Sequence, residues 1–276
     1  MNMNEKLSVI IALVAAGLLP ASVSAQHARV EFVEPSEQQP HANDPDTIWL
    51  DDFDQDREYL EPKINSARMR FSSKVKLGSV GRSMESFYAR GQRGVGGRKV
   101  VFGDAPFGKP HRRGEKFDEV YWRYYVKYPL NWQGGGEAKH SRGIVFTSPR
   151  WTQASILHVW TARGPLTLDP VRGVRDGRVT SRKYNDCDSF KWLGNSPKGR
   201  FAFHSREELG RWVCIEVQWK LNTPGQADGI ARMWVDGTLD TERTRMDFRG
   251  TYEGHGINAV FLESYWNNGS PVDQYR

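Results

Sequence analysis

Aromatic rings and polar or charged side chains alternate at two places in the sequence, with a spacing suited to contacting sugars. His158 and Trp160 are two positions apart, and the same spacing separates Arg123 from Tyr125. Side chains two positions apart share one face of a β-strand. Rings stack on the CH faces of sugars, while arginine and histidine hydrogen-bond to hydroxyl groups. These residues therefore predict a surface that contacts a carbohydrate, with the solvated outer face of a sheet as the alternative.

The segments that carry these residues have the two-residue periodicity of β-strands. Every second side chain of residues 212–221 is apolar, and Gly, Pro, Asn and Asp separate the short runs. No 3.6-residue helical pattern is sustained. We expect an all-β fold of two antiparallel sheets packed as a sandwich, each with an apolar inner face and a polar outer face. The other expected strands are residues 120–128, 143–147, 155–161, 230–235 and 258–265.

The composition excludes several classes of protein. The 276 residues are 38% hydrophobic, and 39 Lys and Arg stand against 33 Asp and Glu, for a formal net charge of +6. That hydrophobic content is too low for a multi-span membrane protein. The basic residues are spread along the whole chain instead of forming a cluster, so nucleic acid is not expected as a partner. An acidic polysaccharide suits both the charge and the polar outer face.

The first 25 residues have the pattern of a secretory signal peptide. A polar start precedes an apolar run at residues 7–19, and small residues lead to an expected cleavage after Ala25. The run is shorter than the roughly 20 residues that span a bilayer. We expect a secreted or periplasmic protein without a membrane partner. A polar leader at residues 26–47 would precede one β-sandwich domain at residues 48–276.

Cys187 and Cys214 are the two cysteines of the sequence. An exported protein meets an oxidising environment, so we predict a disulfide between them. The alternative is that Cys214, inside an apolar strand, is a small buried hydrophobic residue.

A calcium-loop pattern begins at Asp52 and fails further on. Arg57 stands where the loop needs glycine, and Lys63 stands where it needs a bidentate glutamate. Asp52 and Asp54 remain candidates for a structural Ca²⁺ site completed by distant residues, and no cofactor is required. The histidines lack zinc-ligand spacing, and no Gly-x-Ser-x-Gly turn of a serine hydrolase is present.

Residues 211–237 resemble the penultimate hairpin of jelly-roll polysaccharide lyases of the glucuronan lyase and alginate lyase type. The matching features are an aromatic-led strand ending in Leu-Asn-Thr-Pro-Gly, a turn at Asp228-Gly229, and a strand ending in Trp-Val-Asp-Gly. A glycine-rich loop before Lys139 and a Phe-x-Glu-Ser-Tyr strand within residues 260–270 also resemble this group. The resemblance implies a concanavalin-A-like jelly roll and an enzyme that cleaves a uronate-containing polysaccharide by β-elimination. The group has a further C-terminal strand, before which we expect this chain to stop.

A lyase of this kind removes the proton at C5 of a uronate and expels the oxygen at C4. It must neutralise the neighbouring carboxylate and supply a base and an acid. Lysine or arginine can neutralise the carboxylate, so we expect Lys139 or Arg142 in that role and His158 as the candidate base. We expect Arg123, Tyr125, His158 and Trp160 to converge in one trough that holds the sugar chain. The full set of expected substrate-binding residues is Arg123, Tyr125, Trp160, Glu216 and Glu263.

A departure from the pattern of these lyases leaves a second function open. The alginate-cleaving group carries an arginine and paired tyrosines on the strands after its lysine loop, and residues 166–174 supply no tyrosine pair here. A glycan-binding protein without catalysis is therefore the alternative, because the same rings and charges suffice for binding. Hydrolysis is disfavoured, since no strand carries the cluster of carboxylates that the sandwich hydrolases need.

Overall fold

The computed structural model describes residues 43–55, 57, 59–60, 68–78, 81–134, 138–161, 164–203, 205 and 207–276. The expected signal peptide at residues 1–25 and the leader up to residue 42 lie outside the described residues. Most of the glycine-rich loop before Lys139, residues 135–137, lies outside them as well.

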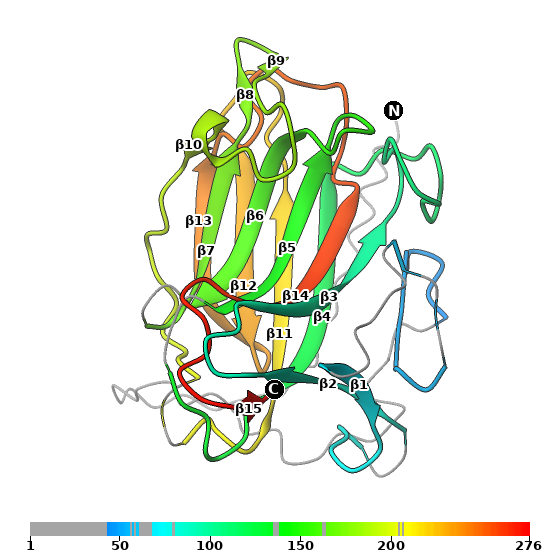
Figure 1. Ribbon diagram of the computed structural model, residues 1–276. Helices are drawn as coiled ribbons and strands as arrows, with labels where there is room; N and C mark the ends of the chain where they lie inside the picture. The colour runs from blue at the N-terminus through cyan, green and yellow to red at the C-terminus, as the bar shows by residue number, and fades with distance from the viewer. Residues whose placement is uncertain are drawn as a thin grey trace, which may run out of the picture.

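Two large antiparallel sheets lie one in front of the other (Figure 1). The six-stranded sheet has the order β10–β7–β6–β5–β14–β3, and the four-stranded sheet has the order β13–β12–β11–β4. The all-β expectation is confirmed. The strands of the six-stranded sheet are β3 (Gly94–Val101), β5 (Ala138–Phe146), β6 (Gln153–Thr161), β7 (Leu166–Arg172), β10 (Lys191–Trp192) and β14 (Ala259–Trp266). Those of the four-stranded sheet are β4 (Glu119–Lys127), β11 (Trp212–Lys220), β12 (Gly229–Val235) and β13 (Thr238–Met246).

Smaller elements complete the described fold. Strands β1 (Met69–Ser72), β2 (Ser83–Tyr88) and β15 (Gln274–Tyr275) form a three-stranded sheet, in which β15 pairs with β2. Strands β8 (Val174–Arg175) and β9 (Arg178–Val179) form a hairpin, and η1 (Cys187–Ser189) is a 3₁₀ turn. Within the described ranges, no helix has the length and apolar character needed to cross a bilayer.

The main core lies between the two large sheets. Val213, Ile215 and Val217 of β11 are fully buried, as the alternation of residues 212–221 predicts. On the facing sheet, Leu157 and Val159 of β6 belong to the same cluster. Because side chains alternate along a strand, His158 and Trp160 are left on the outer face of the six-stranded sheet.

A second apolar cluster covers one end of that outer face. Ile144, Phe146 and Ile156 are buried there, beneath Trp151 and Tyr184 from two loops. This cluster fixes where the loop around Tyr184 lies, and the polar residues of the outer face begin directly beside it.

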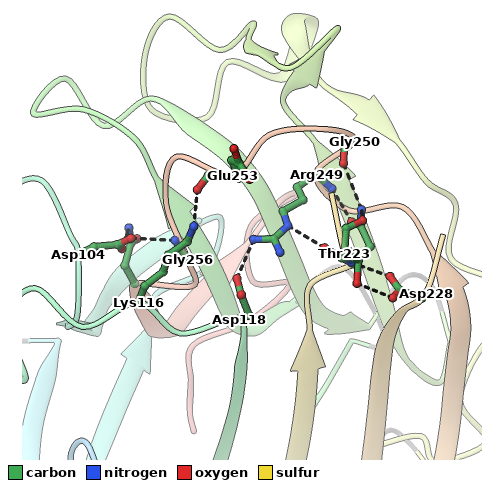
Figure 2. Close-up of polar contacts among 11 residues, drawn as sticks. Asp104, Lys116, Asp118, Thr223, Asp228, Arg249, Gly250, Glu253 and Gly256 are labelled. Atoms are coloured by element: carbon green, nitrogen blue, oxygen red, sulfur yellow. Dashed lines mark hydrogen bonds and ion pairs between the residues drawn. The ribbon is translucent and has the colours of Figure 1, made fainter. Parts of the chain in front are cut away.

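A polar network ties together the loops at one end of the sandwich (Figure 2). The Arg249 guanidinium donates to the Asp118 carboxylate and to the Asn222 carbonyl, each at 2.7 Å. The backbone N–H of Gly256 donates to Asp104 at 2.9 Å. These bonds satisfy polar groups of connecting segments that have no sheet partner, which is how irregular backbone is stabilised at a sheet end.

The predicted disulfide is wrong, because both cysteines are free thiols. Cys187 is exposed on η1, in the segment that lies over the six-stranded sheet. Cys214 is buried in β11, opposite Tyr125 of β4, on the outer side of the four-stranded sheet. Burial raises the pKa of the Cys214 thiol to about 12, with a contribution from Glu216. The two residues belong to opposite layers, so no bridge can form between them.

The two aspartates proposed for calcium serve as hydrogen-bond acceptors for nearby backbone. Asp52 accepts the N–H of Asp54 at 3.1 Å, and Asp54 accepts the N–H of Arg82 at 2.8 Å. In the part of the chain that the structure describes, no group of three or more His, Cys, Asp or Glu side chains is placed to hold a metal ion. The Ca²⁺ site stays a prediction.

Candidate active site

Five of the expected site residues lie together on the outer face of the six-stranded sheet: Lys139 and Arg142 of β5, His158 and Trp160 of β6, and Glu263 of β14. The register of β5 and β6 places Arg142 opposite His158 and Lys139 opposite Trp160. Lys139 and Arg142 are three positions apart and would lie on opposite faces of a regular strand. A register shift at His140 turns the His140 ring inward to the core and brings Lys139 onto the outer face.

Arg142 is the centre of this group. Its side chain is only 2% exposed and pairs with the Glu263 carboxylate of β14 at 2.7 Å. The other terminal nitrogen donates to the Asn185 side-chain oxygen at 2.8 Å. The Tyr184 hydroxyl oxygen also accepts a hydrogen bond from the guanidinium. Arg142 therefore joins β5, β14 and the loop before η1.

Local interactions explain why that loop delivers Tyr184 and Asn185 to Arg142. The backbone N–H of Asn185 donates to the Gln153 side chain at 2.8 Å, and Asn185 adopts a left-handed φ of 54°. Asparagine tolerates this conformation better than most residues do. Asp186 closes the loop by accepting the Arg182 N–H and the Ser189 hydroxyl, both at 2.9 Å.

His158 is a neutral imidazole with a defined tautomer. Burial, together with the charges of Arg142 and Lys139, lowers its pKa to about 3. Its Nδ1 lies 3.0 Å from the backbone carbonyl oxygen of Asp169. A carbonyl can only accept, so Nδ1 carries the proton and Nε2 keeps its lone pair. His158 can thus accept a proton or a hydrogen bond at Nε2, but it is a weak base.

Lys139 is half-buried beside the same cluster. Burial lowers the pKa of its ammonium, Arg142 lowers it as well, and Glu263 acts in the opposite direction. The Nζ atom lies 4.9 Å from the centre of the Tyr265 ring, a cation–π contact across β5 and β14. The ammonium therefore stands next to Arg142 in a poorly hydrated place, where an anion would stabilise its charge.

Three near-parallel rings adjoin these cations. The planes of Trp160 and Trp192 differ by 3°, with ring centres 6.1 Å apart. The His158 ring lies 5.3 Å from Trp160 and 5.9 Å from Trp192. Trp192 is 44% exposed on the edge strand β10. A partly exposed set of parallel rings is suited to the flat apolar face of a sugar.

Several buried polar atoms of this cluster make no hydrogen bond within the described ranges. They are the Arg142 Nε, the Glu263 Oε2 and the Trp160 Nε1. The Trp160 Nε1 nevertheless lies close enough to the Asp169 carboxylate to lower its pKa. Buried polar groups are rarely left unpaired in folded proteins, and such atoms at one place indicate that a ligand or solvent completes them.

The remaining expected site residues lie elsewhere. Arg123 and Tyr125 of β4 and Glu216 of β11 are on the outer face of the four-stranded sheet, where Arg123 lies 3.7 Å from Glu216. The expectation that Arg123 and Tyr125 meet His158 and Trp160 in one trough is wrong. β4 pairs with β11, whereas β5 and β6 belong to the other sheet, so the two sets of side chains point away from each other across the core.

Sequence reasoning missed several residues of the cluster. Tyr184 and Asn185 come from a loop without periodicity, so only their contacts with Arg142 reveal them. Trp192 belongs to a two-residue strand that no pattern signals. Asp169 was missed together with β7, and only the pairing of β6 with β7 places it beside His158.

Comparison with solved structures identifies the fold. An alginate lyase from Aplysia kurodai, described as marine PL-14, superposes with a TM-score of 0.52 at 17% identity, over 76% of this chain and 84% of that chain. The chain has the fold of the jelly-roll polysaccharide lyases. Alginate lyase Aly36B, in complex with an alginate trisaccharide, has a TM-score of 0.48 at 15% identity, over 76% of this chain and 81% of that chain. The endo-β-1,4-glucuronan lyase of Trichoderma reesei has a TM-score of 0.47 at 14% identity, over 75% and 82% of the two chains.

The resemblance to this group of lyases, expected from the hairpin at residues 211–237, is confirmed at the level of fold by the superposition on the Aplysia kurodai enzyme. No protein-family profile and no curated sequence matches the chain.

Proposed function

We propose that this protein is a secreted or periplasmic polysaccharide lyase that cleaves a 4-linked uronate by β-elimination on the outer face of the six-stranded sheet. The observation that carries the proposal is the contact between Arg142 and the Tyr184 hydroxyl, with Lys139 and His158 beside it. This arrangement supplies positive charge, a group that can exchange a proton, and a neutral imidazole at one place. The lyase fold supports the same reading.

The first requirement of the reaction is a more acidic C5 proton. The uronate carboxylate attached to C5 withdraws electron density from C5 effectively only when its own negative charge is neutralised. Lys139 and Arg142 lie side by side on β5 and would bind that carboxylate, in a place of low hydration where charge interactions are strong.

The second requirement is a base on C5 and an acid on the leaving oxygen. The C5–H bond breaks, its proton passes to the base, and its electron pair forms the C4=C5 double bond. The C4–O bond breaks, and the departing oxygen takes up a proton. Arg142 donates to the Tyr184 oxygen and would stabilise that oxygen as an anion, which makes Tyr184 the proposed base. The proton that Tyr184 gains is then available to the leaving oxygen.

His158 has a secondary part in this proposal. Its pKa of about 3 makes it a weak base at neutral pH, but its Nε2 lone pair can accept a hydrogen bond from a sugar hydroxyl or from a protonated carboxyl group. This assignment replaces the expectation that His158 removes the C5 proton.

One observation favours a non-catalytic glycan-binding protein as the second candidate. Arg142 is already paired with Glu263, so part of its charge is neutralised before any substrate binds. Rings and hydrogen-bonding groups would still bind a sugar chain without cleaving it.

The test is direct. The purified protein is incubated with alginate, glucuronan and polymers that mix uronates with neutral sugars, and ultraviolet absorbance of the unsaturated uronate is followed. The proposal predicts a rise with at least one polymer. Binding to a polymer in calorimetry without any absorbance change, across the panel, would establish the glycan-binding alternative instead.

A further inference from the structure

The rings of Trp160 and Trp192 are parallel to within 3°, with centres 6.1 Å apart, and Trp160 lies opposite Lys139 of β5. Trp160 is opposite Lys139 in the register of β6 and β5, and Trp192 stacks towards Trp160 although β7 separates their strands. Neighbouring strands are spaced about 4.8 Å apart. A sugar resting on the two rings would therefore be the neighbour of a sugar held by Lys139 and Arg142.

The polar groups next to these rings suit hydroxyls. The Asp169 carboxylate lies beside His158 on the same face and is 6% exposed. Sugar hydroxyls donate to a carboxylate. The buried Trp160 Nε1 makes no hydrogen bond of good geometry within the described ranges, and it lies close enough to the Asp169 carboxylate to lower the pKa of that group. A sugar hydroxyl placed between them would accept from the indole N–H and donate to the carboxylate. One acceptor and one donor next to aromatic rings are what a neutral pyranose requires.

The charge at this place disfavours a second uronate. Burial raises the pKa of Asp169 to about 6, so the group is mainly ionised at neutral pH and would repel a carboxylate. Arg243 is the cation that acts on Asp169, and its two terminal nitrogens donate to the carbonyl oxygens of Leu193 and Gly194. Its hydrogen bonds are thus directed to the backbone.

We propose that Trp160, Trp192 and Asp169 form a subsite for a neutral sugar, and that the substrate is a heteropolysaccharide in which uronate units are flanked by neutral sugars. This inference rests on the proposed lyase function and names its substrate class. A polymer of uronates alone would place a carboxylate against Asp169 at this subsite.

The experiment compares kcat/KM for unsaturated-uronate formation on two kinds of polymer. Alginate and glucuronan contain uronates only, whereas hyaluronan and deacetylated gellan place neutral sugars on both sides of a 4-linked glucuronate. The inference predicts a higher kcat/KM on at least one mixed polymer. Trp192→Ala should lower the ratio of mixed to uronate-only kcat/KM roughly tenfold, an effect of the size expected for losing one aromatic contact.

Two further variants make the result specific. Asp169→Asn removes the charge and keeps the shape, so it should raise kcat/KM on the uronate-only polymers relative to the mixed ones. Tyr121→Ala removes an exposed aromatic side chain on the four-stranded sheet and should leave the ratio unchanged. If the wild type prefers uronate-only polymers and Trp192→Ala leaves the ratio unchanged, the inference is wrong while the lyase function stands.

If no polymer yields product, the lyase function is rejected, but that result alone does not reject the subsite. The subsite is then tested by titrating tryptophan fluorescence with hyaluronan and alginate oligosaccharides. Tighter binding of the hyaluronan oligosaccharide that Trp192→Ala weakens roughly tenfold would support the subsite. Equal binding of both oligosaccharides by wild type and variant would overturn it.

Discussion

Arg142 and Glu263, on the neighbouring strands β5 and β14, form an ion pair of 2.7 Å in which the two side chains are 2% and 12% exposed. Removing one partner of such a pair leaves the other charge poorly solvated. Glu263→Gln should therefore lower the free energy of unfolding by about 3 kcal/mol in urea titrations.

The matched control is Glu85→Gln, which breaks the pair of Glu85 with the exposed Arg70. Solvent screens that pair, so its loss should cost much less. Equal losses of unfolding free energy in the two variants would show that water screens the Arg142–Glu263 pair, which would contradict its burial in the structure.

The depressed pKa of His158 predicts a loss of stability in acid. Between about pH 3 and its ordinary value of 6.5, the unfolded chain binds a proton at this histidine and the folded chain does not. Stability from this group is complete above pH 6.5 and falls as the pH drops, by up to about 1.4 kcal/mol per pH unit. Asp169 acts in the opposite direction between 3.8 and about 6, because its folded form holds the proton more tightly.

The measurement is urea unfolding of wild type and His158→Gln between pH 4 and 7. The variant should lose less stability than the wild type as the pH is lowered, because one acid-sensitive group is gone. Parallel curves would contradict the assignment of a neutral His158.

The free thiols predict selective labelling. Cys187 is exposed and Cys214 is buried with a raised pKa. A thiol reagent should modify one cysteine in the folded protein and two after denaturation, since only the thiolate reacts. A reducing agent should leave the melting temperature unchanged. If neither cysteine reacts in the denatured, unreduced protein, the two are joined by a disulfide and the assignment of free thiols is wrong.

Substitution of Asn222 tests the network of hydrogen bonds between the loops at the end of the sandwich. Its fully buried side chain accepts the Arg249 N–H at 2.9 Å and donates to the Thr223 carbonyl at 3.0 Å. Asn222→Ala should cost about 2 kcal/mol in unfolding free energy, because a buried N–H loses its acceptor. The exposed Asn131 offers the control, and Asn131→Ala should change stability by less than about 0.5 kcal/mol.

A strand can be predicted from the sequence when one of its faces is apolar and the other is polar. The pattern of Val213, Ile215 and Val217 is local, so it identifies both β11 and its buried face. β3 and β7 were missed, because Gly-Val-Gly-Gly in one and Pro170 in the other interrupt the alternation. A strand with few apolar side chains is recognised only through its partners.

The candidate site was predictable only in part, for a related reason. His158 and Trp160 were placed on one face correctly, since two positions on one strand share a face. Pairing between strands is not local, so Arg123 and Tyr125 were assigned to the wrong sheet. A periodic pattern also cannot reveal the register shift at His140, which brings Lys139 to Arg142. The same is true of the loop that carries Tyr184.

The central claim is that cleavage takes place at Arg142 and Tyr184, on the six-stranded sheet. It is tested most directly by the kcat for unsaturated-uronate formation in Tyr184→Phe and Arg123→Ala, measured on the polymer that the wild type cleaves best. Loss of the proton-transferring hydroxyl should lower kcat about 100-fold or more, while Arg123→Ala, on the opposite sheet, should retain the wild-type kcat. A Tyr184→Phe protein that turns over at the wild-type rate, with activity lost in Arg123→Ala, would contradict the account.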